Sequence, residues 1–322
     1  RSERARVAAA VVAVRKANRT EVPLRFRVLL SEMDPAVKAL AIKKMEQLYY
    51  MEASCDEFHK LHAWIEALCR LPVGRYHPLP VSAASPFEEV SAFLRATRVR
   101  FDERIFGHAE AKEAIVRLLA RWISRGQADA RGLVIGLQGP PGCGKTALVK
   151  HCLAEVLGLP LAVLPLGGAN DGAQLTGHSY TYVGSAPGRV ADALMRAGCM
   201  NPLLLLDEVD KVSDTSRGQE VTNALVHLTD ATQNDRFADA YFGGVDLDLS
   251  RAVMVCTFNR PEAVCPILLD RMARITVAGY SVADKLAIAR RHLLPELLEA
   301  YGLAPGELGF DDDTLRGVMA LV

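Results

Sequence analysis

Residues 133–150 read LVIGLQGPPGCGKTALVK. An apolar run opens this stretch, a glycine-rich segment follows, and the pattern of a helix begins near Lys145. Residues 139–146 match G-x-x-x-x-G-K-[ST], which between a strand and a helix is typical of a phosphate-binding loop. Glycines let successive backbone N–H groups turn inward around phosphate oxygens, and the helix start adds the positive end of its dipole. The stretch therefore predicts a nucleotide site on an α/β fold.

The motif assigns chemistry to its last two residues. Lys145 would neutralise the β and γ phosphates, and the Thr146 hydroxyl would ligate Mg²⁺, so the expected ligands are ATP and Mg²⁺. Cys143 occupies one of the unconstrained positions of the motif, where the backbone and not the side chain contacts the phosphate. This favours a thiol without a specific role over one that regulates the site by oxidation. A chance glycine-rich turn is the competing interpretation, and the flanking strand and helix disfavour it. The residues predicted to bind the nucleotide are Gly139, Pro140, Pro141, Gly142, Cys143, Gly144, Lys145, Thr146 and Asp207.

Two carboxylates follow a run of four leucines at 203–206. Open α/β sheets bind ligands at the carboxyl ends of their strands, and a buried carboxylate is costly unless it is paired or bound to a metal. We therefore expect Asp207 to hold Mg²⁺ through water and Glu208 to polarise the attacking water. An acidic turn is the alternative. The position of the pair 62 residues after Lys145, in the same alternating pattern, favours the cation site.

Two more residues lie where a nucleotide site would use them. Asn259 ends the run VMVCTF and would place an amide beside the attacking water or the γ phosphate; its alternative is an ordinary turn residue. Arg271, in the sequence DRM before another apolar run, is a candidate arginine finger, and its alternative is a surface arginine. The predicted catalytic residues are Glu208, Asn259 and Arg271. The remaining histidines and cysteines show no spacing of metal ligands.

Apolar runs recur along the chain and define the fold class. They lie at residues 133–137, 161–165, 203–206, 252–257 and 274–278. Strands that are apolar on both faces belong in a parallel sheet covered by helices, so we expect an α/β fold. The expected parts are a helical N-terminal region with a proline-rich linker (1–85), the nucleotide-binding α/β domain (86–280) and the start of a small helical lid (281–322).

Helix signals in the N-terminal region give two local predictions. Asp34 followed by Pro35 indicates an N-cap and a first helical residue, opening a helix that runs to about residue 51. Ser54 and Glu57 have the spacing of a capping box, and an apolar stripe follows them. We interpret this stripe as a packing face.

Composition excludes several classes of protein. Half of the 322 residues are hydrophobic and 24% are charged, which excludes a disordered polar chain, and the length suggests about two domains. No apolar run approaches the roughly 20 residues of a membrane helix. Basic and acidic residues balance at 38 each, although residues 1–27 carry eight basic side chains against two acidic ones. That excess fits a solvated helix face better than a polyanion site.

Cysteine usage and the chain start bear on localisation. The seven cysteines include no CxxC pair, which indicates reduced thiols in an intracellular, reducing compartment, the cytoplasm or alternatively an organellar matrix. The chain starts at Arg1 and shows no signal-peptide pattern, as expected of a fragment.

Five segments together resemble the AAA+ module of Lon-type ATP-dependent proteases, over about residues 101–294. They are LQGPPGCGKTALVK, LGGANDGAQLTGHSYTYVGSAPGRV, NPLLLLDEVDKV, ILLDRM and GYSVADKLAIARRHLLP. The resemblance implies an AAA+ P-loop fold and a homo-oligomeric, hexameric ring that unfolds and translocates unfolded or tagged proteins in protein quality control. It further implies that Asn259 is sensor 1 and that Arg271 reaches a neighbouring subunit's nucleotide. Tyr182 and Val183 would form the pore loop that grips an unfolded polypeptide.

The resemblance has departures and leaves alternatives. Relatives carry a sensor 2 arginine and then a serine–lysine peptidase domain, both expected beyond Val322, so peptidase activity is expected only in the full-length protein. Many relatives have two basic residues after Gly177-His178, where this chain has Ser179 and Tyr180. Tyrosines 180 and 182 could instead alternate along a strand and pack. Alternative functions are a Lon-like chaperone or remodeller without peptidase and, from the basic N-terminus, a nucleic-acid-binding motor.

Overall fold

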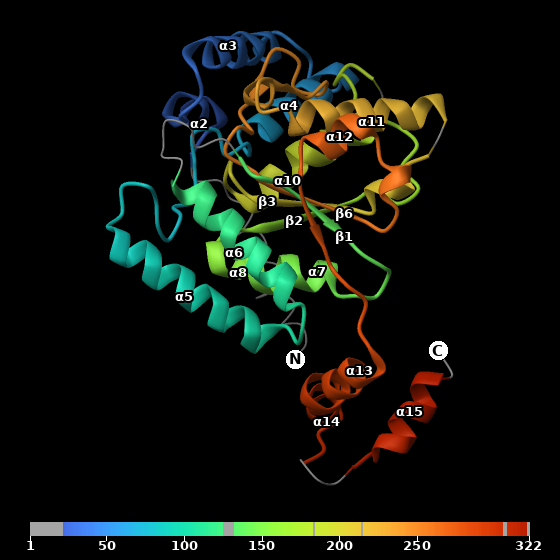
Figure 1. Ribbon diagram of the computed structural model, residues 1–322. Helices are drawn as coiled ribbons and strands as arrows, with labels where there is room; N and C mark the ends of the chain where they lie inside the picture. The colour runs from blue at the N-terminus through green and yellow to red at the C-terminus, as the bar shows by residue number, and fades with distance from the viewer. Residues whose placement is uncertain (1–21, 125–131, 183, 214, 305–307, 321–322) are drawn as a thin grey trace, which may run out of the picture. The chain divides into compact units, whose positions relative to one another are not determined.

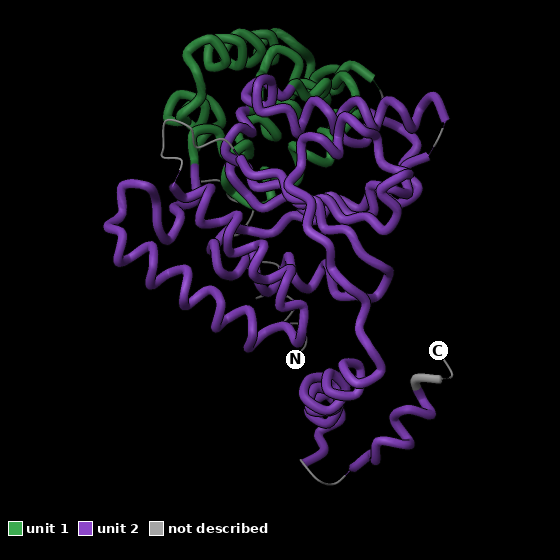
Figure 2. Tube along the Cα trace, in the orientation of Figure 1, with its two compact units in different colours: residues 1–75, 176–199, 238–247 green, residues 76–175, 200–237, 248–322 purple. Residues whose placement is uncertain are grey.

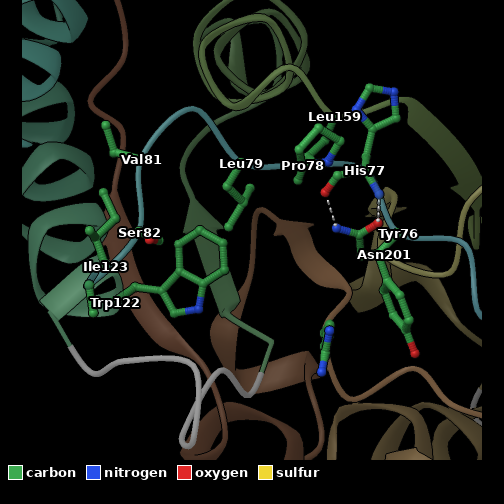
Figure 3. A pocket seen from close by; sticks show the side chains of 12 residues that line it. Tyr76, His77, Pro78, Leu79, Val81, Ser82, Trp122, Ile123, Leu159 and Asn201 are labelled. Carbon is green, nitrogen blue, oxygen red and sulfur yellow. Dashed lines mark hydrogen bonds between the residues drawn. The ribbon is translucent and has the colours of Figure 1, made fainter. Parts of the chain in front are cut away.

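The computed structural model describes residues 22–124, 132–182, 184–213, 215–304 and 308–320. Contacts divide the chain into two compact units, coloured separately in Figure 2. Unit 1 comprises residues 1–75, 176–199 and 238–247, and unit 2 comprises residues 76–175, 200–237 and 248–322. The domain boundaries expected near residues 85 and 280 stay a prediction.

A five-stranded parallel sheet forms the centre of unit 2. The strand order is β2-β3-β6-β1-β7, and each strand pairs in parallel with its neighbours. The bounds are Val134–Gln138 (β1), Leu161–Pro165 (β2), Leu203–Asp207 (β3), Val253–Phe258 (β6) and Ala273–Thr276 (β7). Each strand coincides with one of the apolar runs to within two residues, so the α/β class is confirmed.

Helices cover both faces of this sheet (Figure 1). On one face lie α5 (Phe87–Arg104), α6 (Ala109–Ser124) and a continuous helical segment over 145–157, whose central turn is a π-helix. Their apolar side chains form one core with those of β1, β3 and β6. On the other face lie α11 (Ser216–Thr229) and α12 (Pro266–Asp270). Burial on both faces explains why the inner strands β3 and β6 are almost wholly apolar, whereas the edge strands β2 and β7 are partly exposed.

Unit 1 contains the N-terminal helices and α10 (Arg189–Ala197). The N-terminal helices are α2 (Leu24–Leu30), α3 (Pro35–Tyr49) and α4 (Asp56–Leu68). Pro35 opens α3 as expected, but the Asp34 side chain makes no capping bond. The capping box at Ser54 is wrong, since Cys55 occupies the N-cap and two acidic side chains face the positive helix start instead. Of the basic segment 1–27, residues 1–21 lie outside the described residues.

The C-terminal helices form a small cluster of their own within unit 2. They are α13 (Val282–Ile288), a π-helix (Ala289–Leu293), α14 (Leu294–Ala300) and α15 (Asp312–Ala320). Leu286, Ala289 and Leu315 form its buried centre, and Ser281 with Asp284 makes a capping box at its start. Short elements complete the chain: α9 (Ala173–Thr176), β4 (Phe237–Ala238), β5 (Asp246–Leu247) and 3-10 turns at Val209–Lys211, Asn234–Arg236 and Pro261–Ala263.

No helix among these described segments is both long and apolar enough to cross a bilayer.

Candidate functional site

The glycine-rich loop joins the carboxyl end of β1 to the helical segment that begins at Lys145. Gly142 and Gly144 have φ values of 73° and 84°, in the left-handed region that favours glycine. A Cβ atom at Gly139 would lie 2.2 Å from the carbonyl oxygen of Val277, so this position admits no side chain. The loop therefore keeps its backbone open to an approaching phosphate.

The Lys145 ammonium contacts a second predicted residue. It donates hydrogen bonds to the carbonyl oxygens of Gly139 (2.8 Å) and Pro140 (2.9 Å) and to Oδ1 of Asn259 (2.8 Å). These three acceptors match the three protons of an ammonium group. Asn259 follows β6, which pairs directly with β1, and this explains how residues 114 positions apart meet.

The predicted acidic pair lies at the end of the neighbouring strand. Asp207 is the last residue of β3, and its carboxylate accepts a hydrogen bond from the hydroxyl of Thr257 on β6. The same hydroxyl oxygen accepts the Glu208 N–H at 3.0 Å. Thr257, 1% exposed, thus fixes the turn that carries both carboxylates. The sequence analysis missed Thr257, although a polar residue in an otherwise apolar buried strand is a usable signal.

Glu208 adopts a backbone conformation that is uncommon for its residue type. Its φ is 61°, in the left-handed region where a non-glycine residue costs about 1–2 kcal/mol. The carboxylate pairs with the ammonium of Lys211, and this hydrogen bond raises the pKa of Lys211. A Cβ at Gly167 would lie 2.4 Å from Oε2 of Glu208, so a side chain at this position would require the Glu208 carboxylate to move.

A third acidic residue, also missed, fixes the loop after β6. Asp210 is 5% exposed, and its Oδ2 accepts the backbone N–H groups of Asn259 (3.0 Å) and Arg260 (3.1 Å). Within the described residues its Oδ1 is buried without a hydrogen-bond partner. The position of Asp210, three residues after Asp207, was the feature of the sequence that could have identified it as part of the site. These hydrogen bonds connect the carboxyl ends of β3 and β6, and the contact between Asn259 and Lys145 connects β6 to the loop that follows β1.

Arg271 lies apart from these contacts, at the C-cap of α12. Its Nη2 is 2.8 Å from Oδ2 of Asp230, and its Nη1 donates to the carbonyl oxygen of Val226. Both partners belong to the carboxyl end of α11, where the helix dipole also favours a cation. The guanidinium is therefore held by groups other than those that hold Lys145.

Two aromatic rings beside the loop escaped the sequence analysis. The His108 and Tyr280 rings lie 4.4 Å apart, centroid to centroid. Nε2 of His108 lies 2.9 Å from the Cys143 carbonyl oxygen, and because that oxygen only accepts, the bond places a proton on Nε2. Burial lowers the pKa of His108, which favours the neutral ring. A Cβ at Gly144 would lie 3.4 Å from the Tyr280 hydroxyl, so this ring borders the loop directly.

The segment with the two tyrosines, residues 177–188, is a loop of unit 1 and contains no strand among its described residues. Tyr182 is 68% exposed, and Val183 lies outside the described residues. The ends of the loop are held at Asp239, whose Oδ2 accepts the Gly188 N–H at 2.9 Å. A Cβ at Gly177 would lie 2.8 Å from Oδ1 of the same carboxylate. Alternation along a strand is therefore wrong for these residues.

Asp239 gives a prediction for the pH dependence of stability. The residue is 1% exposed, and burial raises the pKa of its carboxyl to about 6 from an ordinary 3.8. Between these values the folded chain holds a proton that the unfolded chain has released. The contribution of this group to stability is thus fully present below about pH 4 and is lost as the pH rises through about 6. It amounts to at most about 3 kcal/mol.

Urea unfolding of the wild type and of Asp239→Asn, from pH 4.5 to 7.5, measures this contribution. The wild type should gain stability relative to the variant as the pH falls, because the asparagine side chain does not titrate and all other groups are shared. A difference in unfolding free energy that stays constant with pH would contradict the prediction.

Comparison with known proteins adds the family. Residues 135–280 match the model of the ATPase family associated with various cellular activities (AAA). The chain is 32% identical to a Lon protease homolog of Acanthamoeba polyphaga mimivirus over 95% of its length and 36% identical to the Lon protease of Frankia alni over 91%. It is 37% identical over 87% of its length to the peroxisomal Lon protease homolog 2 of Arabidopsis thaliana.

The chain covers 30%, 33% and 30% of the lengths of these three relatives, respectively. The matched AAA region contains the glycine-rich loop, the acidic pair, Asn259 and Arg271. The chain therefore belongs to the AAA ATPase family and carries an ATPase module of the Lon protease type.

Proposed function

We propose that this chain is the ATP-hydrolysing unfolding and translocation module of a Lon-type ATP-dependent serine protease that acts in protein quality control. The observation that carries the proposal is the edge formed by β3, β6 and β1. There Lys145 contacts Asn259, which follows β6, at 2.8 Å, and Asp207 ends the neighbouring strand β3 with Glu208 directly after it. A cation, an amide and two carboxylates at adjoining strand ends suit the hydrolysis of a nucleoside triphosphate.

The residues of this edge fit ATP and Mg²⁺. Mg²⁺ prefers oxygen ligands, and the Thr146 hydroxyl and the Asp207 carboxylate would hold it together with phosphate oxygens. No cluster of three or more His, Cys, Asp or Glu suited to a metal occurs among the described residues, so the metal would depend on the nucleotide. When bound, Mg²⁺ neutralises charge on the phosphates. Lys145 would exchange its loop carbonyl acceptors for phosphate oxygens.

The other residues of the site would act on the attacking water, the γ phosphate and the base. Glu208 would accept a proton from the attacking water, and Asn259, fixed by Asp210 and Lys145, would orient that water or the γ phosphate. Arg271 would act on the nucleotide of a neighbouring subunit in a hexameric ring. The rings of His108 and Tyr280 offer flat surfaces against which a purine base can stack.

The proposed substrates are unfolded or tagged proteins, gripped by Tyr182 and Val183. An exposed aromatic ring can contact many side chains by area and stacking without demanding one sequence. We further propose an intracellular, reducing compartment, the cytoplasm or an organellar matrix, in keeping with seven free cysteines. Peptidase activity is proposed for the full-length protein only.

Unfolding of a fluorescent, tagged protein by the natural full-length protein tests the proposed function. Loss of fluorescence should require ATP and Mg²⁺, and peptide products should appear if a peptidase follows in the same protein. Unfolding without products would favour the chaperone alternative. ATP hydrolysis that no unfolded protein stimulates and that unfolds nothing would contradict the proposal.

Replacing Tyr182 with alanine should uncouple ATP turnover from unfolding. The ring is exposed and belongs to a different unit from Lys145, so basal ATPase should stay within about twofold of the wild type, the scatter typical of a surface substitution. Unfolding of the fluorescent substrate should fall sharply. Tyr49→Ala, which removes another exposed tyrosine of unit 1, is the matched control. Wild-type unfolding by Tyr182→Ala would return this ring to a packing or surface role.

A further inference from the structure

The loop 177–188 contacts the N-terminal helices through Tyr180. The Lys44 ammonium on α3 donates a hydrogen bond to the Tyr180 hydroxyl at 2.7 Å and lies 4.1 Å from the centroid of the same ring. It also lies 4.7 Å from the ring centroid of Trp64 on α4, whose ring is 6.0 Å from that of Tyr180. One cation and two aromatic rings from three separate segments of unit 1 therefore form a single cluster.

Trp64 makes this cluster rigid. It is fully buried, its Nε1 donates to the Tyr241 carbonyl oxygen at 2.8 Å, and its ring lies 6.3 Å from that of Phe242. A second contact reinforces the first, since the Lys60 ammonium on α4 donates to the carbonyl oxygen of Thr181 at 3.2 Å. Two helices thus hold two successive residues of the loop.

The next tyrosine behaves differently. Tyr182 is 68% exposed, whereas Tyr180 is partly buried in the cluster. A turn separates them, in which the Tyr182 N–H donates to the Ser179 carbonyl oxygen at 3.1 Å. Because Tyr180 is held and only two residues away, its contacts restrict the positions that Tyr182 can occupy.

We propose that Tyr180 is the positioning residue of this loop. Its contacts with Lys44 and Trp64 couple helices α3 and α4 to the loop and set the position from which Tyr182 meets an unfolded polypeptide. The N-terminal helices thereby take part in gripping the substrate. This inference rests on the proposed role of Tyr182, and the experiments below separate the two.

A fluorescence experiment reads the coupling directly. This chain has two tryptophans, so Trp122→Phe, together with phenylalanine in place of any tryptophan outside these 322 residues, leaves Trp64 as the sole reporter, next to Tyr180 and Lys44. In the full-length protein with this background, adding a chemically unfolded protein and ATP should shift Trp64 emission. Tyr180→Ala should abolish this response, while Tyr49→Ala on the same helix as Lys44 should retain it. An equal response in Tyr180→Ala would overturn the proposal, as would no response in the Trp122→Phe background.

Activity measurements test the consequence. Tyr180→Ala should slow unfolding of the tagged substrate at least tenfold and raise the KM for the unfolded protein, with basal ATPase within twofold of the wild type. Lys44→Met, which keeps the aliphatic stem and removes the charge, should lower unfolding in the same direction. The double variant should be no worse than Tyr180→Ala alone, because both changes break one contact.

Two variants that keep a large side chain at position 180 test the proposal if Tyr180→Ala does not fold. Tyr180→Phe keeps the ring and loses only the hydrogen bond, so it should unfold substrate faster than Tyr180→Arg, which sets a second cation against Lys44. Equal rates in these two variants would overturn the proposal. If Tyr182→Ala impairs unfolding while every Tyr180 and Lys44 variant is normal, the positioning role fails and the role of Tyr182 stands. If Tyr182→Ala is also normal, the proposed function of the loop fails.

Discussion

Replacing Lys145 with alanine is expected to weaken ATP binding by about 10- to 100-fold, whereas Glu208→Gln should keep ATP bound and leave it unhydrolysed. The first range corresponds to the loss of one charged hydrogen bond, about 1.5–3 kcal/mol. Lys145 donates all three of its protons to acceptors around the loop and carries positive charge to where phosphates would lie. Glutamine at position 208 removes the proton acceptor together with the exposed ion pair to Lys211, and loss of a general base typically lowers the rate by 10² to 10⁴.

Equilibrium binding of a fluorescent ATP analogue and single-turnover hydrolysis separate the two effects. Lys150→Ala on the same helical segment is the matched control for Lys145→Ala, and Glu103→Gln on α5 is the matched control for Glu208→Gln. Each control changes an exposed side chain and alters the net charge by the same amount as the variant it matches. Both controls should bind and hydrolyse ATP normally. Equal loss of affinity in Lys145→Ala and Glu208→Gln would remove Glu208 from its proposed role and make it part of the binding surface.

The sheet and its loop were predictable because their signals are local. Strands inside a sheet that is covered by helices are apolar on both faces, and enough apolar residues remain in the edge strands β2 and β7 for five runs to mark five strands. Glycine at 142 and 144 is required by the backbone itself, and the lysine that follows starts a helix. A carboxylate directly after a run of leucines is also a local signal, because a buried carboxylate is costly unless it is paired or bound to a metal. These features need no knowledge of distant partners.

The contacts that fix the site were not predictable, because each joins residues far apart in the sequence. Thr257 lies 50 residues from Asp207, and its hydrogen bond depends on the register of β3 with β6. The capping box at Ser54 failed since the helix starts one residue later than the pattern suggested. The loop that carries Tyr180 was expected, but the hydrogen bond from Lys44, 136 residues away, could not be predicted from a local pattern. Local patterns give elements, and tertiary pairing selects which polar groups meet.

Mixing two inactive variants tests whether Arg271 acts on a neighbouring subunit. In the proposed ring each site combines Lys145 and Glu208 of one subunit with Arg271 of the next. Arg271→Ala should lower the ATPase rate by about 10³ to 10⁵, the usual worth of an arginine finger, and Glu208→Gln should be nearly inactive for a different reason. Asp230 and Val226 hold the guanidinium at the end of α11, so a variant of Arg271 leaves the loop around Lys145 intact.

A mixed ring contains one kind of complete site. Where an Arg271→Ala subunit offers its Glu208 to the intact Arg271 of a Glu208→Gln neighbour, every group needed for hydrolysis is present. ATPase should therefore rise above that of both parents, with a maximum at intermediate mixing ratios of the full-length variants. In the control mixture Arg316→Ala takes the place of Arg271→Ala. Arg316 is exposed, and among the described contacts it pairs only with Asp313. The ATPase rate of the control mixture should follow the average of its two parents. If subunits demonstrably exchange and the Arg271→Ala mixture also gives only the average, Arg271 does not act in trans, and hydrolysis must be completed within each subunit.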